Sequence, residues 1–271
     1  MTILVLGATG KTGRRVAERL QAKGVDFRAA SRSAPTRFDW DDRATWADAV
    51  EGATAVYLVA SDDPEPTEPF VKQAVAAGVR RFVVLSGRNM DKAAGRFGDG
   101  MWAAEQAVRA SGAEWAFARA NNFNQNFDVD FWLPAITAGR LALPIGDVGE
   151  PFIDLSDVAD VVTELLTTDG HAGKIYELSG PESLTFAEAV GQISAAVGRP
   201  IEFVEITPEQ YAEDLRAEGY PEEVATNVNG MFELMREGLL ETPTDGVEQV
   251  LGRPAKSFRS YVRDVWAPGP R

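Results

Sequence analysis

The sequence predicts an α/β fold: a Rossmann-type, doubly wound parallel sheet with a smaller, mostly helical C-terminal substrate lobe. In residues 1–120, short apolar runs alternate with helical stretches, which is typical of βαβ units. A glycine-rich turn also joins the first apolar run directly to the first helix. After about Asn121 the rhythm changes, so we expect the chain to return to the sheet and to form the lobe.

The elements of the first half follow from apolar runs and from the glycines that end them. Strands are expected at residues 2–6, 26–31, 36–38, 54–60, 81–86 and 114–118. Helices are expected at residues 12–23, 68–77 and 101–111, each ending beside a glycine. Right-handed crossovers then place helices on both faces of the sheet.

The second half is expected to be more irregular. Strands are expected at residues 141–144, 151–155 and 174–178, and helices at 157–167, 185–198, 209–218 and 222–237. Ser156 is the expected N-cap of the helix at 157–167. Thr207, Pro208 and Gln210 have the spacing of a capping box with Pro at the first helical position. We expect one compact unit, with a Rossmann core over residues 1–150 and the sheet's completion plus an acidic lobe over 151–271.

Charge and composition exclude several classes of function. The 271 residues carry 27 Lys and Arg against 41 Asp and Glu, a net charge of −14, which argues against binding to nucleic acid or to anionic lipid. The chain has no cysteine and a single histidine, so we expect neither a metal site nor a thiol nucleophile. No apolar run is long enough for a membrane span and no signal peptide is visible, so we expect a cytoplasmic protein.

The acidity is concentrated in one segment. Residues 201–250 hold 13 acids and two bases, a net charge of −11, which leaves −3 for the rest of the chain. The simplest interpretation is a solvated helical face. A substrate that enters beneath this segment is then expected to be neutral or cationic rather than anionic.

The strongest motif is the turn from Gly7 to Gly13. Gly7 allows a tight turn, Gly10 lets the backbone approach a pyrophosphate, and Gly13 lets the helix pack closely. The helix N-terminus favours an anion, and the loop side chains add hydroxyl donors and charge. These side chains are Thr9, Lys11 and Thr12. The turn therefore predicts a site for a dinucleotide cofactor.

The end of the second strand indicates which dinucleotide. An NAD site usually offers an acid there, about 20 residues after the glycines, to hold the ribose 2′-hydroxyl. Here the chain reads Ser31, Arg32, Ser33. Arg32 suits a 2′-phosphate, with the serines as hydrogen-bond donors, although an ordinary solvated arginine is the alternative. We therefore expect NADP(H) in preference to NAD(H).

A family resemblance extends over nearly the whole chain. The stretches that carry it are GATGKTGRRVAERL, FDWDD, AVYLV, RFVVLS, EQAVRASGAEWAFARANNFNQNF, PFIDLSDVADV and YELSGPESLTFAEA. The GxxGxxG spacing resembles the short-chain dehydrogenase/reductase superfamily, and the remainder resembles its NmrA-like branch. That branch includes NADPH-dependent quinone reductases and NADP-sensing regulators.

The resemblance implies roles for residues that follow the strands. For the cofactor it implies Asp39 and Trp40 beside the adenine, Val59, Ala60 and Ser61 along the middle, and Asn121, Asn122 and Phe123 over the nicotinamide. It places Ser86 beside both cofactor and substrate, and we assign Ser86 and Asn122 as catalytic residues. For the substrate we expect Trp102, Asn126 and Phe127. The Asn and Phe cluster at 121–127 either orients a flat ring or forms a structural crossing loop.

Other apolar residues are further candidates for the substrate pocket: Phe131, Trp132, Met231, Phe232 and Met235. The last three have helical spacing, which is equally typical of a simple core.

The chain departs from the superfamily in its proton donor. Many reductases of the superfamily carry a Tyr-xxx-Lys pair on the helix after the serine. In this sequence those positions fall on Phe97 and Met101, and no neighbouring register supplies an acid.

The remaining candidate donors have structural explanations. Asp154 and Asp157 suit helix capping, Glu105 suits pairing with Arg109, and His171 suits a surface loop. Arg119 suits either a buried ion pair or a substrate clamp.

Three functions remain open. The first is an NADPH-dependent reductase of a small, largely apolar quinone or carbonyl, because a quinone needs only hydride and takes its proton from water. The second is a non-catalytic NADP(H)-binding redox sensor, and the third a non-redox pathway enzyme that reuses the fold. The expected partner is a small molecule, and the expected state is a monomer or a homodimer.

Overall fold

A seven-stranded parallel sheet forms the centre of the molecule. The computed structural model describes residues 2–129 and 131–267. The strand order is β3-β2-β1-β4-β5-β6-β9, and every neighbouring pair is parallel. The strands are β1 (Thr2–Leu6), β2 (Phe27–Ser31), β3 (Thr36–Arg37), β4 (Ala53–Val59), β5 (Arg81–Gly87), β6 (Glu114–Ala120) and β9 (Lys174–Leu178). This confirms the predicted fold class.

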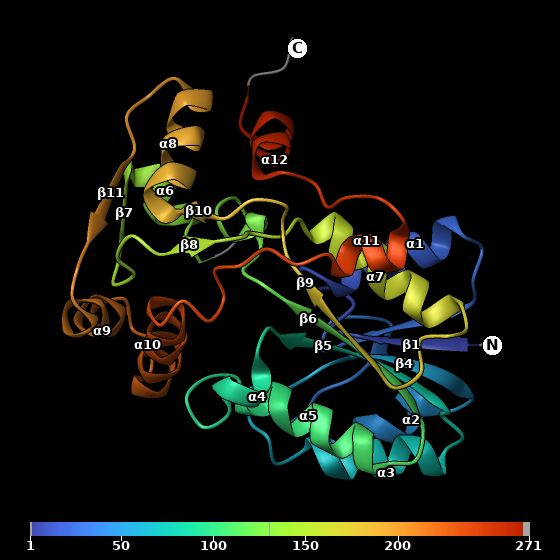
Figure 1. Ribbon diagram of the computed structural model, residues 1–271. Coiled ribbons are helices and arrows are strands. Elements are labelled where there is room, and N and C mark those ends of the chain that lie inside the picture. Colours follow the sequence, from blue (N-terminus) through green and yellow to red (C-terminus); the bar gives the residue numbers. More distant parts are fainter. Residues whose placement is uncertain (1, 130, 268–271) are drawn as a thin grey trace.

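Helices cover both faces of this sheet (Figure 1). One face carries α1 (Gly13–Ala22), α7 (Leu155–Thr167) and α11 (Gly246–Leu251), and the other carries α2 (Trp46–Val50), α3 (Thr67–Ala76) and α5 (Asp99–Ala110). Each layer buries its own apolar core: Val16, Val161 and Leu165 belong to the first, and Trp46, Phe70 and Val108 to the second. Burial of these aliphatic and aromatic side chains drives the packing of the layers.

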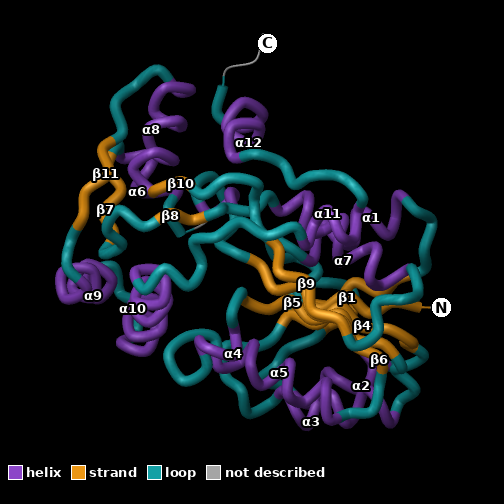
Figure 2. The backbone as a smooth tube through the Cα atoms, in the orientation of Figure 1, coloured by secondary structure: helices purple, strands orange, loops and turns teal. Residues whose placement is uncertain are grey.

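A second, smaller part lies beyond the carboxyl ends of the strands (Figure 2). Its elements are α6 (Leu133–Ala138), β7 (Arg140–Leu143), β8 (Gly149–Glu150), β10 (Leu184–Thr185), α8 (Phe186–Val197), β11 (Glu202–Glu205), α9 (Pro208–Ala217), α10 (Glu222–Arg236) and α12 (Phe258–Val265). We call this part the lobe. Its core is aromatic, with Phe127, Phe152, Phe186 and Phe258 in contact. The short helix α4 (Met90–Ala93) lies between α5 and the lobe.

Chain from both sides of residue 150 builds the lobe. Its core includes Phe127 and Ile136 from the first half as well as Tyr211 and Phe232 from the second. Between them, α7 and β9 return to the sheet, as the sequence predicts. Within the described ranges, no helix has both the length and the apolar character needed to cross a membrane.

Two local predictions about α7 are wrong. The N-cap of α7 is Asp154, whose carboxylate accepts a hydrogen bond from the Ser156 N–H, so Ser156 lies inside the first turn. No strand forms over 151–155, where Ile153 makes only an isolated bridge to Phe123. Both errors arise because an apolar segment that leads into a capped helix also resembles a strand. The capping box at Thr207 and Gln210 is confirmed.

Candidate active site

The glycine loop lies between β1 and α1. Gly7 adopts a left-handed conformation with φ of 61°, and the Gly10 N–H donates to the Gly7 carbonyl at 2.8 Å. A Cβ atom on Gly13 would lie 2.2 Å from the Gly7 oxygen, so only glycine lets α1 pass this close. No side chain caps the N-terminus of α1, so no side chain competes with an anion for the N–H groups of its first turn. The loop therefore fits a pyrophosphate.

The end of β2 lies beside this loop. Thr9 donates to the Ser31 hydroxyl at 3.1 Å, and the same oxygen accepts hydrogen bonds from the backbone N–H groups of Ser33 and Ala34. Ser31 therefore closes the turn and joins it to the glycine loop. Arg32, the next residue, is exposed at this edge.

In the strand order, β3 and β4 lie on opposite sides of β1, which the glycine loop follows. Trp40 packs edge-on against Phe38 and Phe70, with ring centroids 5.0 and 5.1 Å apart. The Asp39 carbonyl accepts a hydrogen bond from the Trp46 indole. The three predicted residues at the end of β4 are partly buried: Val59, Ala60 and Ser61. The predicted cofactor residues thus lie along one carboxyl edge of the sheet, where open α/β folds bind ligands.

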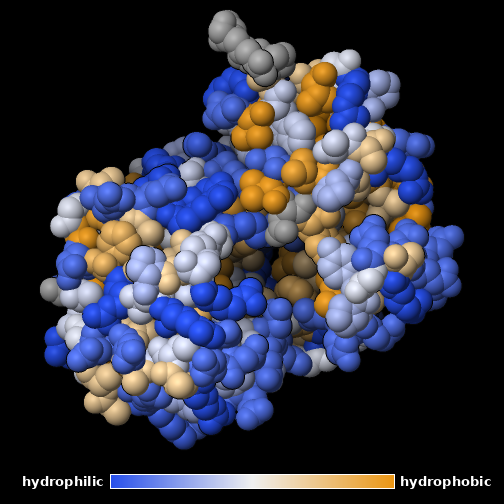
Figure 3. Space-filling view, turned by 180° about the vertical axis from the view of Figure 1, so that it is seen from behind, coloured by the Kyte–Doolittle hydropathy of each residue, from blue (hydrophilic) through white to orange (hydrophobic). Residues whose placement is uncertain are grey.

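A cavity of about 240 Å³ adjoins this edge, between the sheet and the lobe. From behind, the surface is hollowed where the two parts meet, with hydrophobic side chains at its edge (Figure 3). The residues that line the cavity are Lys11, Leu85, Ser86, Gly87, Arg88, Asn89, Ala93, Phe97, Met101, Ala120, Asn121, Asn122, Phe123, Asn126, Met231, Leu234, Leu239 and Leu240. This set contains no carboxylate, tyrosine or histidine, so the described wall is apolar with a few amides and two cations.

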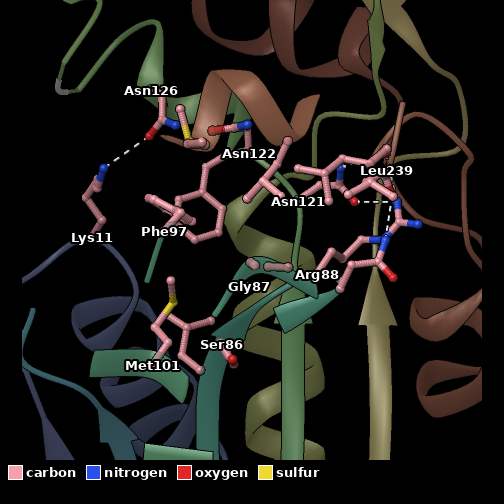
Figure 4. A pocket seen from close by; sticks show the side chains of 18 residues that line it. Lys11, Ser86, Gly87, Arg88, Phe97, Met101, Asn121, Asn122, Asn126 and Leu239 are labelled. Carbon is pink, nitrogen blue, oxygen red and sulfur yellow. Dashed lines mark hydrogen bonds between the residues drawn. The ribbon is translucent and has the colours of Figure 1, made fainter. Parts of the chain in front are cut away.

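Several predicted site residues meet in this cavity (Figure 4). The Lys11 ammonium donates to Asn126 Oδ1 at 3.1 Å and lies 5.8 Å from the centre of the Phe123 ring. Ser86 is the second-to-last residue of β5, and its buried hydroxyl has no hydrogen-bond partner within the described chain. The Asn122 amide contacts the Met235 sulfur at 3.6 Å. Ser86 and Asn122 are therefore polar groups set in a largely apolar wall.

Two predicted substrate residues do not line the cavity. Phe127 is 0% exposed and packs against Trp132 and Phe152, so the structure places it in the lobe core and not in the cavity wall. Trp102 packs beside Met90 and Leu234, outside the lining set. Aromatic spacing alone does not distinguish a pocket from a core, because both bury the ring.

The other apolar pocket candidates divide in the same way. Met231 lines the cavity, whereas Trp132, Phe232 and Met235 are buried in the lobe core and Phe131 packs against it.

A buried polar network behind the cavity involves residues that the sequence analysis missed. The Asn121 amide donates to Glu150 Oε1 at 2.7 Å, and the Asn122 N–H donates to the same oxygen at 2.9 Å. Arg88 donates to Asn121 Oδ1 at 2.7 Å. Burial raises the pKa of Glu150 to about 7, although these hydrogen bonds and the charge of Arg88 oppose the shift. The Asn121 side chain therefore fixes the segment that follows β6.

Arg119 is a structural residue rather than a substrate clamp. It forms a bidentate pair with buried Glu105, at 2.8 and 2.7 Å, and contacts Glu177 at 3.3 Å. Burial lowers the pKa of Arg119, but these ion pairs outweigh that effect and raise it. The expected pair of Glu105 with Arg109 also forms, at 3.6 Å.

The other candidate proton donors also have structural roles. Asp154 caps α7, and buried Asp157 pairs with Arg253 at 2.7 Å. His171 lies 2.7 Å from the Tyr176 hydroxyl, away from the cavity lining.

The parallel sheet, the glycine loop at its carboxyl edge and the lobe across the cavity define a Rossmann-type nucleotide-binding protein. The chain belongs to the NmrA-like family, whose model matches residues 1–264. It is 36% identical, over 96% of both chains, to a (4-alkanoyl-5-oxo-2,5-dihydrofuran-3-yl)methyl phosphate reductase of Streptomyces griseus. It is 31% identical, again over 96% of both chains, to an NAD(P)H azoreductase of Xenophilus azovorans.

Solved structures share the fold. An NADPH-dependent quinone oxidoreductase of Escherichia coli, complexed with NADPH, superposes with a TM-score of 0.79 at 20% identity, covering 98% of this chain and 99% of the other. A Citrobacter triphenylmethane reductase complexed with NADP(H) gives a TM-score of 0.78 at 18% identity, covering 97% and 99%.

Proposed function

We propose that this chain is an NADPH-dependent reductase that acts on a small, largely apolar quinone or carbonyl compound. The observation that carries the proposal is the cavity itself. The cavity adjoins the carboxyl edge of the sheet, where the glycine loop lies. Its wall is apolar except for a few hydrogen-bonding groups such as Ser86 and Asn122. Relatives named as reductases of a dihydrofuranone phosphate and of azo compounds support a reductase of conjugated acceptors.

The cofactor is held by residues of the carboxyl edge. Gly7, Gly10 and Gly13 with the N-terminus of α1 receive the pyrophosphate, and Arg32 receives the 2′-phosphate. When bound, NADPH supplies a hydride.

The residues of the cavity orient the acceptor rather than protonate it. The hydroxyl of Ser86 and the amide of Asn122 are suited to donate hydrogen bonds to an acceptor oxygen. Phe97 and Met101, at the positions of the superfamily's Tyr and Lys, both line the cavity and neither can donate a proton. Quinones and conjugated carbonyls fit such a site because they spread the added charge and take a proton from water.

A direct test is the loss of NADPH absorbance with a panel of quinones, conjugated ketones and aldehydes. We expect turnover of quinones and about a tenfold or larger loss of kcat/KM in Ser86→Ala, because one oriented hydrogen bond is removed. Tight NADP(H) binding without turnover of any acceptor would favour the non-catalytic sensor instead. Absence of NADP(H) binding by calorimetry would exclude both and favour a non-redox enzyme.

The preference for NADPH is tested at Arg32. We expect Arg32→Ala to reduce the ratio of NADPH to NADH affinity by about tenfold to a hundredfold, the range for a charge-assisted hydrogen bond. Arg37 is an exposed arginine on the neighbouring β3 that pairs with Asp42 at 3.6 Å, so Arg37→Ala is the matched control. An equal effect of both substitutions would show that Arg32 does not bind the 2′-phosphate.

A further inference from the structure

One side of the cavity is closed by a segment without regular secondary structure. Residues 239–242, which we call the roof segment, follow α10 and precede α11. Its first two side chains, Leu239 and Leu240, line the cavity. Leu239 lies opposite the end of β5 and beside the side chains of Arg88 and Asn121 (Figure 4). The roof segment therefore limits the space that the cavity offers to a ligand.

Side chains from the segments that follow β5 and β6 hold the main chain of the roof segment. Asn89 Nδ2 donates to the Leu239 carbonyl at 2.5 Å. Arg88 Nη1 donates to the carbonyls of Leu240 and Thr242 at 3.0 and 2.9 Å. Asn121 Nδ2 adds a bond to the Leu240 carbonyl at 3.2 Å. A segment that lacks its own backbone ladder thus obtains its position from donors that follow β5 and β6.

The two residues after β5 are shaped for this contact. Asn89 has φ of 50° and is the single non-glycine residue with positive φ in the described chain. Asparagine tolerates this left-handed conformation better than most residues, yet the conformation still has a cost that other contacts must offset. Arg88 is 9% exposed, and its guanidinium faces Glu177 at 3.5 Å on β9, with Glu150 also close enough to interact. A buried arginine that binds main-chain carbonyls is a rigid support.

We propose that Arg88 and Asn89 are positioning residues that fix the roof segment, and that Leu239 and Leu240 thereby determine how wide an acceptor the cavity admits. The inference rests on the proposed function, and it names the acceptor class as flat and narrow. Because the carbonyls of the roof are held from the sheet side, its leucines stay at a fixed height above the loop at Asn122. A looser roof segment then changes which acceptor widths the cavity admits, without changing the affinity for the cofactor.

The test uses two variants and one matched control. Asn89→Gly keeps the left-handed conformation but removes the donor to Leu239 together with one lining side chain. Leu239→Ala removes lining volume and keeps the main-chain bonds, and hydrogen–deuterium exchange separates the two effects. Arg96→Gln is the control, because Arg96 joins the same two parts of the molecule through Glu237 at 2.7 Å but does not touch the roof. The acceptors are 1,4-benzoquinone and the wider 2-methyl-1,4-naphthoquinone, and hydrogen–deuterium exchange follows residues 239–242.

We expect exchange in the roof segment to rise about fivefold in Asn89→Gly, the factor associated with one net hydrogen bond. In both variants, the ratio of kcat/KM for the naphthoquinone to that for benzoquinone rises about threefold or more, while NADPH affinity and the Arg96→Gln control stay unchanged. Unchanged exchange, or faster exchange with an unchanged ratio in both variants, overturns the proposal.

Failure of the proposed function is distinguishable from failure of this inference. If no acceptor is turned over by the unmodified chain, the proposed function fails. The affinities of the two quinones, measured by quenching of tryptophan fluorescence, then replace kcat/KM. The ratio of these affinities and the hydrogen–deuterium exchange of the roof segment decide whether the roof limits the width of the ligand.

Discussion

At the scale of single residues, Gly10 is the sharpest test of the glycine loop. A Cβ at Gly10 would lie 3.1 Å from the Gly7 oxygen, so the loop must shift by a few tenths of an ångström to accept Gly10→Asp. Its carboxylate would occupy the space of the pyrophosphate and repel it. We expect loss of NADPH binding by calorimetry, with a Tm close to that of the unmodified chain. Gly191→Asp, on the exposed face of α8 with no atom near its Cβ position, is the control and keeps binding.

Glu150 predicts an unusual pH dependence of stability. Its pKa rises on folding to about 7 because it is buried, so the folded chain holds this proton more tightly than the unfolded chain. The contribution is therefore full below the unfolded pKa and is lost as the pH rises through the folded pKa. Relative to Glu150→Gln, the unmodified chain is expected to lose up to about 3 kcal/mol of unfolding free energy between about pH 4 and pH 8.

Urea denaturation of both chains at several pH values measures this difference. The comparison cancels the other titrating groups that the two chains share. A gap between the two chains that stays constant with pH would contradict the assignment of the raised pKa to Glu150.

Single residues also show why part of the site was predictable. Ser86 lies at the carboxyl end of β5, and Asn122 and Asn126 lie in the segment after β6, so topology brings them to one edge of the sheet. Arg88 and Glu150 were missed because their contacts bridge distant parts of the chain. Arg88 binds the carbonyl of Thr242, 154 residues away, and a main-chain carbonyl leaves no trace in the sequence.

At the scale of elements, the first half was predictable because each strand is a buried apolar run. The expected strand at 81–86 and helix at 68–77 differ from β5 and α3 by a residue at one or both ends. In the lobe, the short β11 and α12 were missed. β11 pairs only with β7, and two of its four residues are exposed, so it lacks the apolar run of a central strand.

The start of α7 gives a prediction at this scale. Asp154 accepts from the Ser156 N–H at 2.8 Å and from the Gln125 amide at 3.1 Å, so it both caps the helix and satisfies a buried amide. We expect Asp154→Ala to lower the free energy of unfolding by about 2 kcal/mol or more. Ser156→Ala removes a hydroxyl that donates to Asp154 alone and is expected to cost less than about 1 kcal/mol. Equal losses in urea denaturation would refute the assignment of the cap.

At the scale of the whole molecule, the uneven charge separates the surface from the cavity. The net charge of −11 over residues 201–250 lies mainly on exposed positions of α9 and α10 and the loops beside them. The described cavity wall instead carries Lys11 and Arg88 and no carboxylate. The acidic surface therefore does not require a cationic substrate, and the wall itself suits an acceptor that gains negative charge on reduction.

The same charge distribution predicts that self-repulsion in the lobe weakens stability at low salt. Glu213 is exposed on α9, among acids with few compensating bases. We expect Glu213→Lys, which reverses the charge, to raise the Tm by about 1–2 °C at low ionic strength. Glu213→Gln only removes the charge, so we expect about half of that rise. Both gains should shrink at about 0.5 M salt, where the Debye length falls to a few ångströms. A gain that is the same for both residues, or that survives high salt, would point to helix propensity instead of charge repulsion as its cause.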